Sequence, residues 1–149
     1  MRATVQRVSS AAVSAGEGHR AEIGPGLLVY LGVATDDTEQ DARFLADKVR
    51  HLRIFNDQAG QLNRSLVDVG GAVLVVSAFT LLGDARKGRR PAYVAAAEPQ
   101  RANELYERFC ETLEQENQEV RRGVFRAYMQ VESTNDGPVC ILLDSRKLF

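Results

Sequence analysis

Apolar residues follow two different spacings along the chain, one typical of strands and one typical of helices. Residues 27–33 and 72–76 are uninterrupted apolar runs of strand length, which predicts strands buried on both faces. Residues 4–13 mix apolar residues with β-formers and precede a Gly-Glu-Gly turn signal, so we expect a strand or one arm of a hairpin there. Shorter strands are expected at residues 52–55, 120–124, 129–133 and 139–143.

Two segments carry helical spacing. Asp36 is the candidate N-cap of the first helix, and Glu39, three residues later, would complete a capping box. Pro99 suits the first turn of the second helix. Each helix has one apolar stripe, formed by Ala42, Leu45, Ala46 and Val49 in the first and by Leu105, Phe109 and Leu113 in the second.

Long apolar strands combined with two helices predict an α/β or α+β fold, in which a mixed, curled or barrel-like sheet packs against two main helices. A fully parallel, doubly wound sheet would need more helices than the chain offers. No internal repeat or Pro/Gly/Ser-rich linker divides the sequence. We therefore expect one domain over residues 1–149, with a short C-terminal tail at residues 146–149.

Composition removes several classes of protein. The chain has 19 basic and 20 acidic side chains and a net charge of -1, so it is not a bulk polycation that binds nucleic acid through overall charge. Its apolar runs are too short to span a membrane, and its first residues lack the apolar region of a secretory signal. Two cysteines do not form a disulfide framework, so a reducing cytoplasm is expected.

Most catalytic motifs are missing from the sequence. It has no G-x-S-x-G, phosphate-loop or G-x-G-x-x-G pattern. His19 and His51 have no Cys or acidic neighbour at metal-ligand spacing, so neither a metal nor a cofactor is expected. A hydrolase that used Ser77 or Cys140 as its nucleophile would need a base that the sequence does not supply. Packing is the expected role of Cys140, in a buried strand, and of Cys110, on the second helix.

Three segments nevertheless combine residues that could act on a substrate. At the end of a buried strand, Ser77 and Thr80 supply hydroxyls, and the backbone N–H groups around them could stabilise an oxyanion. The simpler alternative is that these hydroxyls only satisfy backbone groups at a strand end. The Gly137-Pro138 step could be cis, with its carbonyls aimed at an ammonium group, or could simply be a tight turn between two strands.

The third segment is the polar loop at residues 83–91. Its four cations could contact phosphates, which would position a nucleic acid without reading its sequence. The alternative is a solvated loop whose charges are balanced by acidic neighbours. The cations are Arg86, Lys87, Arg89 and Arg90.

Taken in order, these segments resemble the D-aminoacyl-tRNA deacylase family, over about residues 2–145. Each matching piece is short, but their order and spacing make the resemblance specific. The pieces are residues 5–9, 24–29, 52–55, 66–71, Ser77-Ala78-Phe79-Thr80-Leu81, 83–91, Met129-Gln130-Val131-Glu132 and Asn135-Asp136-Gly137-Pro138-Val139.

The resemblance implies a homodimer that hydrolyses the ester between a D-amino acid, or mischarged glycine, and the terminal ribose of tRNA. Such an enzyme releases free D-amino acid and tRNA, rejects L-amino acids and so proofreads translation. It implies no cofactor and no DNA or membrane partner.

The same resemblance assigns roles to particular residues. The Gly-Pro step of the family is cis and enters the partner's pocket, where its carbonyls hold the substrate amino group and leave no room for an L side chain. Since an apolar pocket buries the same area of both enantiomers, selection by a rigid clash is physically sensible. Substrate selection falls to Gly137, Pro138, Val139, Cys140, Met129 and Arg7, catalysis to Ser77, Ala78 through its N–H, Phe79 and Thr80, and tRNA binding to Arg86, Lys87, Arg89 and Arg90.

Two positions depart from the family pattern. Ala78 replaces a usual Gln, and Cys140 replaces a usual Thr. Arg126 and Tyr128 are bulkier than expected beside Met129. These departures leave open a related deacylase that accepts L-alanyl-tRNA, or a tRNA-binding paralogue without turnover. The hydrolytic group also stays open, between Thr80 and the vicinal hydroxyl of the substrate ribose.

Overall fold

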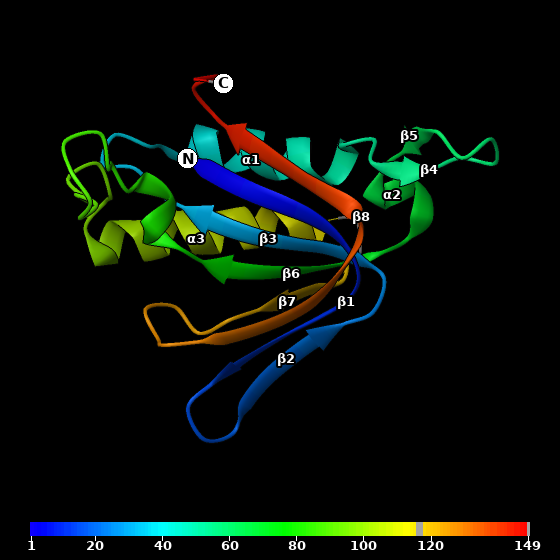
Figure 1. Cartoon of the computed structure of the whole chain (residues 1–149), viewed down its shortest axis with the longest axis horizontal. Helices are drawn as coiled ribbons and strands as arrows, with labels where there is room; N and C mark the ends of the chain where they lie inside the picture. The colour runs from blue at the N-terminus through cyan, green and yellow to red at the C-terminus, as the bar shows by residue number, and fades with distance from the viewer. Residues whose placement is uncertain (116–117, 149) are drawn as a thin grey trace.

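The computed structural model describes residues 1–115 and 118–148, which form one mixed sheet covered by two main helices (Figure 1). The sheet has the order β2-β1-β3-β6-β7, and β8 pairs with the other edge of β1. Strand β6 is parallel to β3 and β7, whereas β1 is antiparallel to β2, β3 and β8. The strands are β1 (Arg2–Ala15), β2 (His19–Ile23), β3 (Gly26–Gly32), β6 (Ala72–Ser77), β7 (Val120–Arg122) and β8 (Gln130–Asp144).

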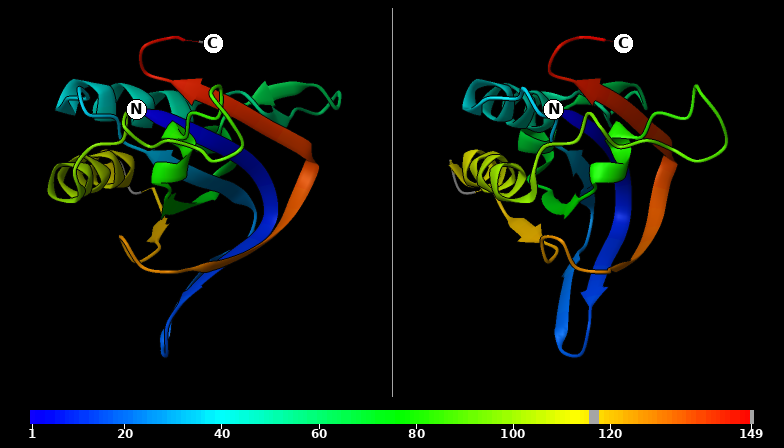
Figure 2. Two further views of the ribbon diagram at one scale, coloured as in Figure 1. Left: turned by 60° about the vertical axis from the view of Figure 1, so that its left-hand side comes forward. Right: turned by 90° about the vertical axis from the view of Figure 1, so that its left-hand side faces the viewer.

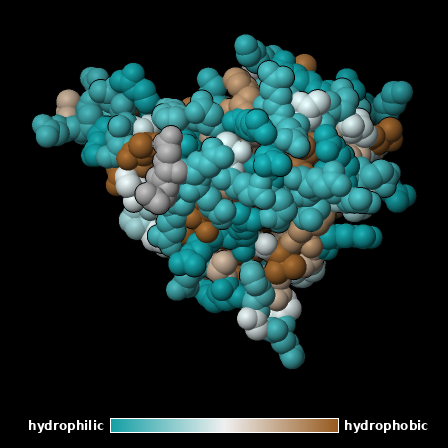
Figure 3. Space-filling model, turned by 180° about the vertical axis from the view of Figure 1, so that it is seen from behind, coloured by the Kyte–Doolittle hydropathy of each residue, from teal (hydrophilic) through white to brown (hydrophobic). Residues whose placement is uncertain are grey.

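The sheet is strongly curled, and helices α1 (Glu39–His51) and α3 (Pro99–Glu114) lie together on one of its faces (Figure 2). The outer surface of this helical layer is largely hydrophilic (Figure 3). The prediction of a mixed, curled sheet against two main helices is therefore confirmed. Shorter elements complete the fold: β4 (Phe55–Asn56), β5 (Leu62–Arg64), α2 (Leu66–Val69) and the 3-10 helix η1 (Phe79–Leu82).

The core explains why β3 and β6 are apolar on both faces. Alternate residues such as Leu27 and Val29 pack toward the helices, whereas Leu28 and Leu74 belong to a second apolar cluster on the other face of the curled sheet. Both predicted helix stripes are fully buried in the first cluster. Burial of these stripes against the sheet holds the two layers together.

The start of the first helix differs from the prediction. Thr38, not Asp36, is the N-cap, and the capping partner is Asp41 instead of Glu39. The Asp41 carboxylate accepts hydrogen bonds from the Thr38 N–H at 2.9 Å and from the Thr38 hydroxyl at 2.7 Å. Asp36 instead forms an ion pair with Arg146, so the acidic spacing matched two registers and the tertiary contact decided between them.

Four strand predictions also need correction. The strand expected at 52–55 is confined to Phe55–Asn56, because β5 pairs only there and the Ile54 carbonyl accepts a hydrogen bond from Arg7 instead. The strand expected at 120–124 ends at Arg122. The two strands expected at 129–133 and 139–143 are one long strand, β8, since both parts pair with the single continuous strand β1.

The C-terminal end of the described chain is tied to the N-terminal end. The Ser145 N–H donates to the Met1 carbonyl at 2.9 Å, and Arg146 pairs with Asp36 and Asp37. The expected tail at 146–149 thus begins with a bonded residue, while Phe149 lies outside the described residues. Across the described ranges, no helix combines the length and apolar character needed to cross a membrane.

Replacing Phe109 by Ala should lower the free energy of unfolding by about 3–5 kcal/mol, because its fully buried ring leaves a cavity between α3 and the sheet. Urea denaturation followed by circular dichroism measures this change. Phe44→Ala on the exposed side of α1 is the matched control and should cost much less, since Phe44 is 39% exposed. Equal losses for the two variants would contradict this account of the core.

Candidate functional site

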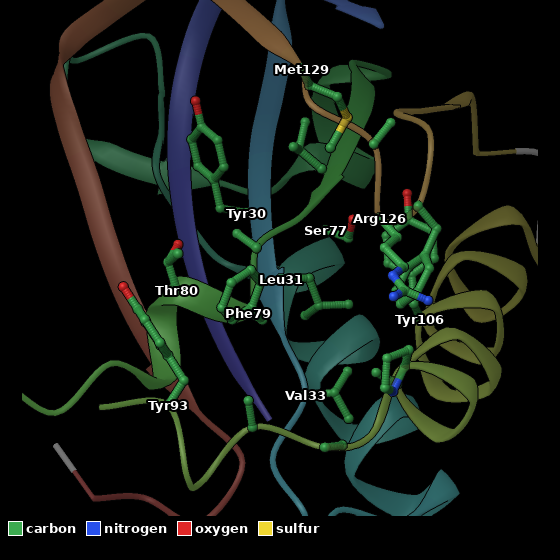
Figure 4. A pocket seen from close by; sticks show the side chains of 18 of the residues that line it. Tyr30, Leu31, Val33, Ser77, Phe79, Thr80, Tyr93, Tyr106, Arg126 and Met129 are labelled. Atoms are coloured by element: carbon green, nitrogen blue, oxygen red, sulfur yellow. The ribbon is translucent and has the colours of Figure 1, made fainter. Parts of the chain in front are cut away.

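A cavity of about 690 Å³ lies where the parallel strands β3 and β6 end (Figure 4). The carboxyl ends of parallel strands are common positions for ligand sites. Side chains from the sheet, η1, the start of α3 and the segment before β8 line it. The lining includes Tyr30, Leu31, Val33, Val76, Ser77, Ala78, Phe79, Thr80, Tyr93, Tyr106, Phe125, Arg126, Tyr128 and Met129.

Close packing at Gly32 brings η1 against the end of β3. A Cβ at this position would lie 2.5 Å from the Leu82 side chain and 3.0 Å from the Ala78 carbonyl oxygen. Any larger residue would therefore push η1 away from the sheet. The absence of a side chain at Gly32 thus lets Ser77, the last residue of β6, and Thr80, within η1, border one cavity.

The hydroxyl groups of the cavity are available to a ligand. Within the described residues, the side chains of Ser77, Thr80, Tyr30 and Tyr93 make no hydrogen bond. Burial raises the pKa of Tyr30, so this phenol stays protonated. The idea that Ser77 and Thr80 only satisfy backbone groups at a strand end is therefore not what the structure shows.

The backbone donors of this segment differ from the expectation. The Ala78 N–H donates to the Leu31 carbonyl at 2.8 Å, so this donor is already used in extending the β3–β6 pairing and is not free for an oxyanion. The N–H groups of Phe79 and Thr80 start η1, and none of the described residues accepts a hydrogen bond from them. These two groups, rather than that of Ala78, are the donors that the site offers.

Aromatic residues border the cavity on the η1 side. The rings of Phe79 and Tyr93 pack edge to face with centroids 5.0 Å apart, and Phe79 remains 59% exposed. On the α3 side, the Tyr106 hydroxyl donates to the Val75 carbonyl at 3.0 Å. Tyr106 therefore supports the end of β6, and its hydroxyl is not free to react with a ligand.

The Gly137-Pro138 step lies outside this cavity. Its peptide bond is cis, and both residues are exposed in the middle of β8. It is therefore not a tight turn between two strands. Gln6 pairs with Cys140 and Val8 pairs with Asn135, so residues 136–139 bulge from the strand opposite Arg7 alone.

Two side chains hold this bulge in place. The buried Arg7 donates to the Asp136 carbonyl at 2.7 Å and to the Ile54 carbonyl at 2.6 Å. The Asn135 amide donates to the Val139 carbonyl at 3.0 Å, and its oxygen accepts from the Val139 N–H at 2.8 Å. A Cβ on Gly137 would lie 2.3 Å from the Val139 nitrogen, so the bulge needs glycine there.

The last residue of the bulge and the residue that follows it face opposite ways. Val139 is buried, whereas Cys140 is exposed, so the packing role expected for Cys140 is wrong. Residues alternate between the faces of a strand, and Val139 takes the inward position. Cys110 is buried as expected, and burial raises the pKa of its thiol to about 12. Neither cysteine lines the cavity.

The polar loop at residues 83–91, called the basic loop from here on, connects directly to the cavity. It leaves η1 through Asp84, returns through the Asp84–Ala92 bridge and then reaches Tyr93. Arg86 forms a two-pronged ion pair with Asp84 and holds the pKa of that carboxyl well below its usual range. Lys87, Arg89 and Arg90 are exposed and have no carboxylate partner among the described residues.

Five residues of the expected site therefore meet in one cavity, and the others do not. Ser77, Ala78, Phe79, Thr80 and Met129 line it, while residues 137–139 belong to the separate bulge, with Arg7 opposite it and Cys140 directly after it. The structure adds Tyr30, Tyr93, Arg126 and Asn135, which the sequence reasoning did not select. No group of three or more metal-ligating side chains occurs in the described part of the chain.

Replacing Arg7 by Gln should lower the free energy of unfolding by about 2–4 kcal/mol, because two carbonyls would lose a charged donor at a largely buried position. Arg20→Gln, which changes an exposed arginine on β2, is the control and should cost less than about 0.5 kcal/mol. Urea denaturation of both variants makes the comparison. A loss for Arg7→Gln as small as that of the control would show that Arg7 does not hold the bulge.

Comparisons with known proteins agree with the sequence resemblance. The family described as D-Tyr-tRNA(Tyr) deacylase matches residues 4–144. The D-aminoacyl-tRNA deacylases of Anaeromyxobacter dehalogenans (strain 2CP-C) and Thermotoga petrophila are 61% and 55% identical, and each alignment covers all of both chains. A solved structure described as c-Myc DNA Unwinding Element Binding Protein has a TM-score of 0.90 and 37% identity, over 97% of this chain and 98% of that one. The chain therefore belongs to the D-Tyr-tRNA(Tyr) deacylase family.

Proposed function

We propose that this protein is a D-aminoacyl-tRNA deacylase whose chemistry takes place in the cavity at the ends of β3 and β6. It hydrolyses the ester between a D-amino acid and the terminal ribose of tRNA and releases both products. The observation that carries this proposal is the pair of unused N–H groups of Phe79 and Thr80 beside free hydroxyls. Its substrate would place the enzyme in the cytoplasm, where tRNA is charged.

The backbone donors would stabilise the charge that develops during hydrolysis. Water adds to the ester carbonyl, and negative charge collects on the carbonyl oxygen before the bond to the ribose oxygen breaks. Donors that already point at this oxygen lower the barrier without having to reorganise, and losing one such donor typically costs a factor of about 10²–10³. Phe79 and Thr80 offer these donors because the first N–H groups of η1 have no helical acceptor.

The attacking water would be activated by the substrate itself. Thr80 has a free hydroxyl, but no described residue hydrogen-bonds to it, and neither histidine lines the cavity. A threonine nucleophile needs a base within hydrogen-bond reach. The vicinal hydroxyl of the terminal ribose lies next to the ester in every substrate and can orient the water. It therefore takes the role that a side-chain base would have.

The Gly137-Pro138 bulge would complete the cavity of a second copy of the chain. In its own subunit it is exposed and lies outside the cavity, although Arg7 and Asn135 hold it in one position. A loop that is held rigidly while it points into solvent suits insertion into a partner. There its main-chain atoms would form a wall against L side chains, whereas glycine, which has none, would be accepted.

The basic loop would receive the acceptor end of the tRNA. Lys87, Arg89 and Arg90 have no acidic partner in the part of the chain that the structure describes, and the loop leads to Tyr93 on the cavity wall. Phosphate contacts would align the RNA without reading its sequence. The neighbouring ring of Phe79 is exposed enough to contact a base.

The purified protein should release D-Tyr from D-tyrosyl-tRNA and leave L-tyrosyl-tRNA intact, as measured by loss of radiolabelled amino acid from tRNA. Thr80→Ala should keep turnover within about threefold of the original protein, because the threonine hydroxyl has no base to activate it. Loss of turnover in Thr80→Ala, with tRNA binding unchanged, would instead favour a threonine nucleophile. A folded protein that releases neither amino acid would exclude the deacylase function.

Subunit mixing should show whether the bulge acts in the partner. Gly137→Ala should inactivate the bulge by its clash with Val139, and Thr80→Trp should block the cavity. Each variant alone should be inactive. Equal amounts refolded together should recover about a quarter of the original activity, because about half of the dimers are mixed and each mixed dimer has one of its two sites intact. Deacylation after co-refolding, with light scattering to confirm dimers, measures this. A mixture as inactive as its components would show that the bulge serves its own subunit.

A further inference from the structure

The cavity wall contains a guanidinium group, that of Arg126, without a carboxylate partner. Arg126 and Glu98 are the charged residues among those that line the cavity. Neither has an ion pair within the described residues. Arg122, which lies nearby in the sequence, is by contrast paired with Glu107 and Glu114. The described chain also leaves Lys87, Arg89 and Arg90 unpaired on the basic loop, but Arg126 is the unpaired cation that lines the cavity.

The backbone at Arg126 is unusual for a residue with a side chain. Its φ angle is 64°, in the left-handed region that favours glycine. Residues that hold such conformations are concentrated at functional sites, where surrounding structure maintains them. Here the turn between β7 and β8 places Arg126 on the α3 side of the cavity, in the region of Tyr106 (Figure 4).

The position of Arg126 relative to the basic loop indicates which part of the substrate it meets. Thr80 and Tyr93 border the opposite side of the cavity, and the basic loop joins the chain next to Tyr93 (Figure 4). Phosphates of the tRNA would therefore approach from the Tyr93 side. The side chain of the esterified amino acid is the part that remains to face Arg126.

We propose that Arg126 is a specificity-determining residue that favours D-amino acids with a carboxylate side chain, aspartate or glutamate. This inference rests on the proposed deacylase function. A guanidinium binds a carboxylate through two parallel hydrogen bonds, and the exposed side chain of Arg126 is accessible to a ligand in the cavity. The only other charge on this wall, Glu98, lies at the N-terminus of α3, where the helix dipole offsets it.

The test compares three esters that differ in the charge and size of the amino acid: D-aspartyl-, D-asparaginyl- and D-tyrosyl-tRNA. Arg126→Gln removes the charge at similar length, and Arg126→Lys retains the charge. Arg126→Gly suits the left-handed backbone, so its thermal midpoint should be unchanged or higher, which separates lost recognition from lost folding. Arg20→Gln on β2 makes the same change in net charge outside the cavity.

The original protein should prefer the D-aspartyl ester to its neutral D-asparaginyl counterpart. Arg126→Gln and Arg126→Gly should lower kcat/KM for the D-aspartyl ester about tenfold or more, mainly through KM, since the contact binds ground and transition states alike. The D-tyrosyl ester should change less than about twofold in all variants, and Arg126→Lys should keep most of the preference. Arg20→Gln should leave the ratio of the esters unchanged.

Other outcomes would overturn this inference. Equal losses on all three esters would show that Arg126 contacts a phosphate that every tRNA carries. An unchanged preference in Arg126→Gln would show that the guanidinium does not meet the amino acid. If either result is found while the original protein still hydrolyses D-tyrosyl-tRNA, only the proposed role of Arg126 is wrong. If the original protein hydrolyses none of the three esters, the proposed deacylase function itself is wrong.

Discussion

The buried guanidinium of Arg7 connects the parts of the structure on which the candidate function depends. It bonds to the Ile54 carbonyl, the Asp136 carbonyl and the Asn56 side chain, and so joins β1 to the loop after α1 and to the bulge of β8. A charge at this depth is stable only when several acceptors surround it. The same acceptors fix how residues 136–139 leave the sheet, which gives the exposed Gly137-Pro138 step a defined position.

The cavity depends on a second constraint, the parallel pairing of β3 with β6. This pairing places Gly32 and Ser77 side by side at the carboxyl ends of β3 and β6. The short helix η1 follows directly and crosses the end of β3. The turn leaves the N–H groups of Phe79 and Thr80 without acceptors among the described residues, and such unused polar groups lower stability unless a ligand or water satisfies them. A site built on backbone donors and substrate groups needs few reactive side chains, which agrees with the shortage of catalytic motifs in the sequence.

Positive charge lies on two sides of this cavity, and we infer a different role for each side. The basic loop presents Lys87, Arg89 and Arg90 to solvent near the Tyr93 side, where a polyanion can approach. Arg126 is an exposed residue that borders the cavity on the α3 side. In the proposed function, this separation would let one group of charges bind RNA in general while a single guanidinium tests the amino acid.

Much of the fold could be predicted from local patterns. The helix stripes led by Leu45 and Phe109 and the apolar runs of β3 and β6 were all correct, because burial imposes a periodicity that any such segment must show. The predictions were wrong where one local sequence pattern is compatible with two structures. Asp36 and Thr38 are both acceptable caps, and a Gly-Pro step inside a strand looks the same in sequence as a turn between two strands.

For the candidate site, the sequence by itself determined the residue types and the family resemblance, including Ser77, Thr80 and the Gly137-Pro138 step. Tertiary structure alone decided that the Ala78 N–H is occupied by Leu31, that Arg126 faces the cavity and that the Gly-Pro bulge lies outside it. The physical reason is that a motif specifies local chemistry, whereas the availability of a donor or a charge depends on partners that are distant in sequence and meet only when the sheet pairs and curls.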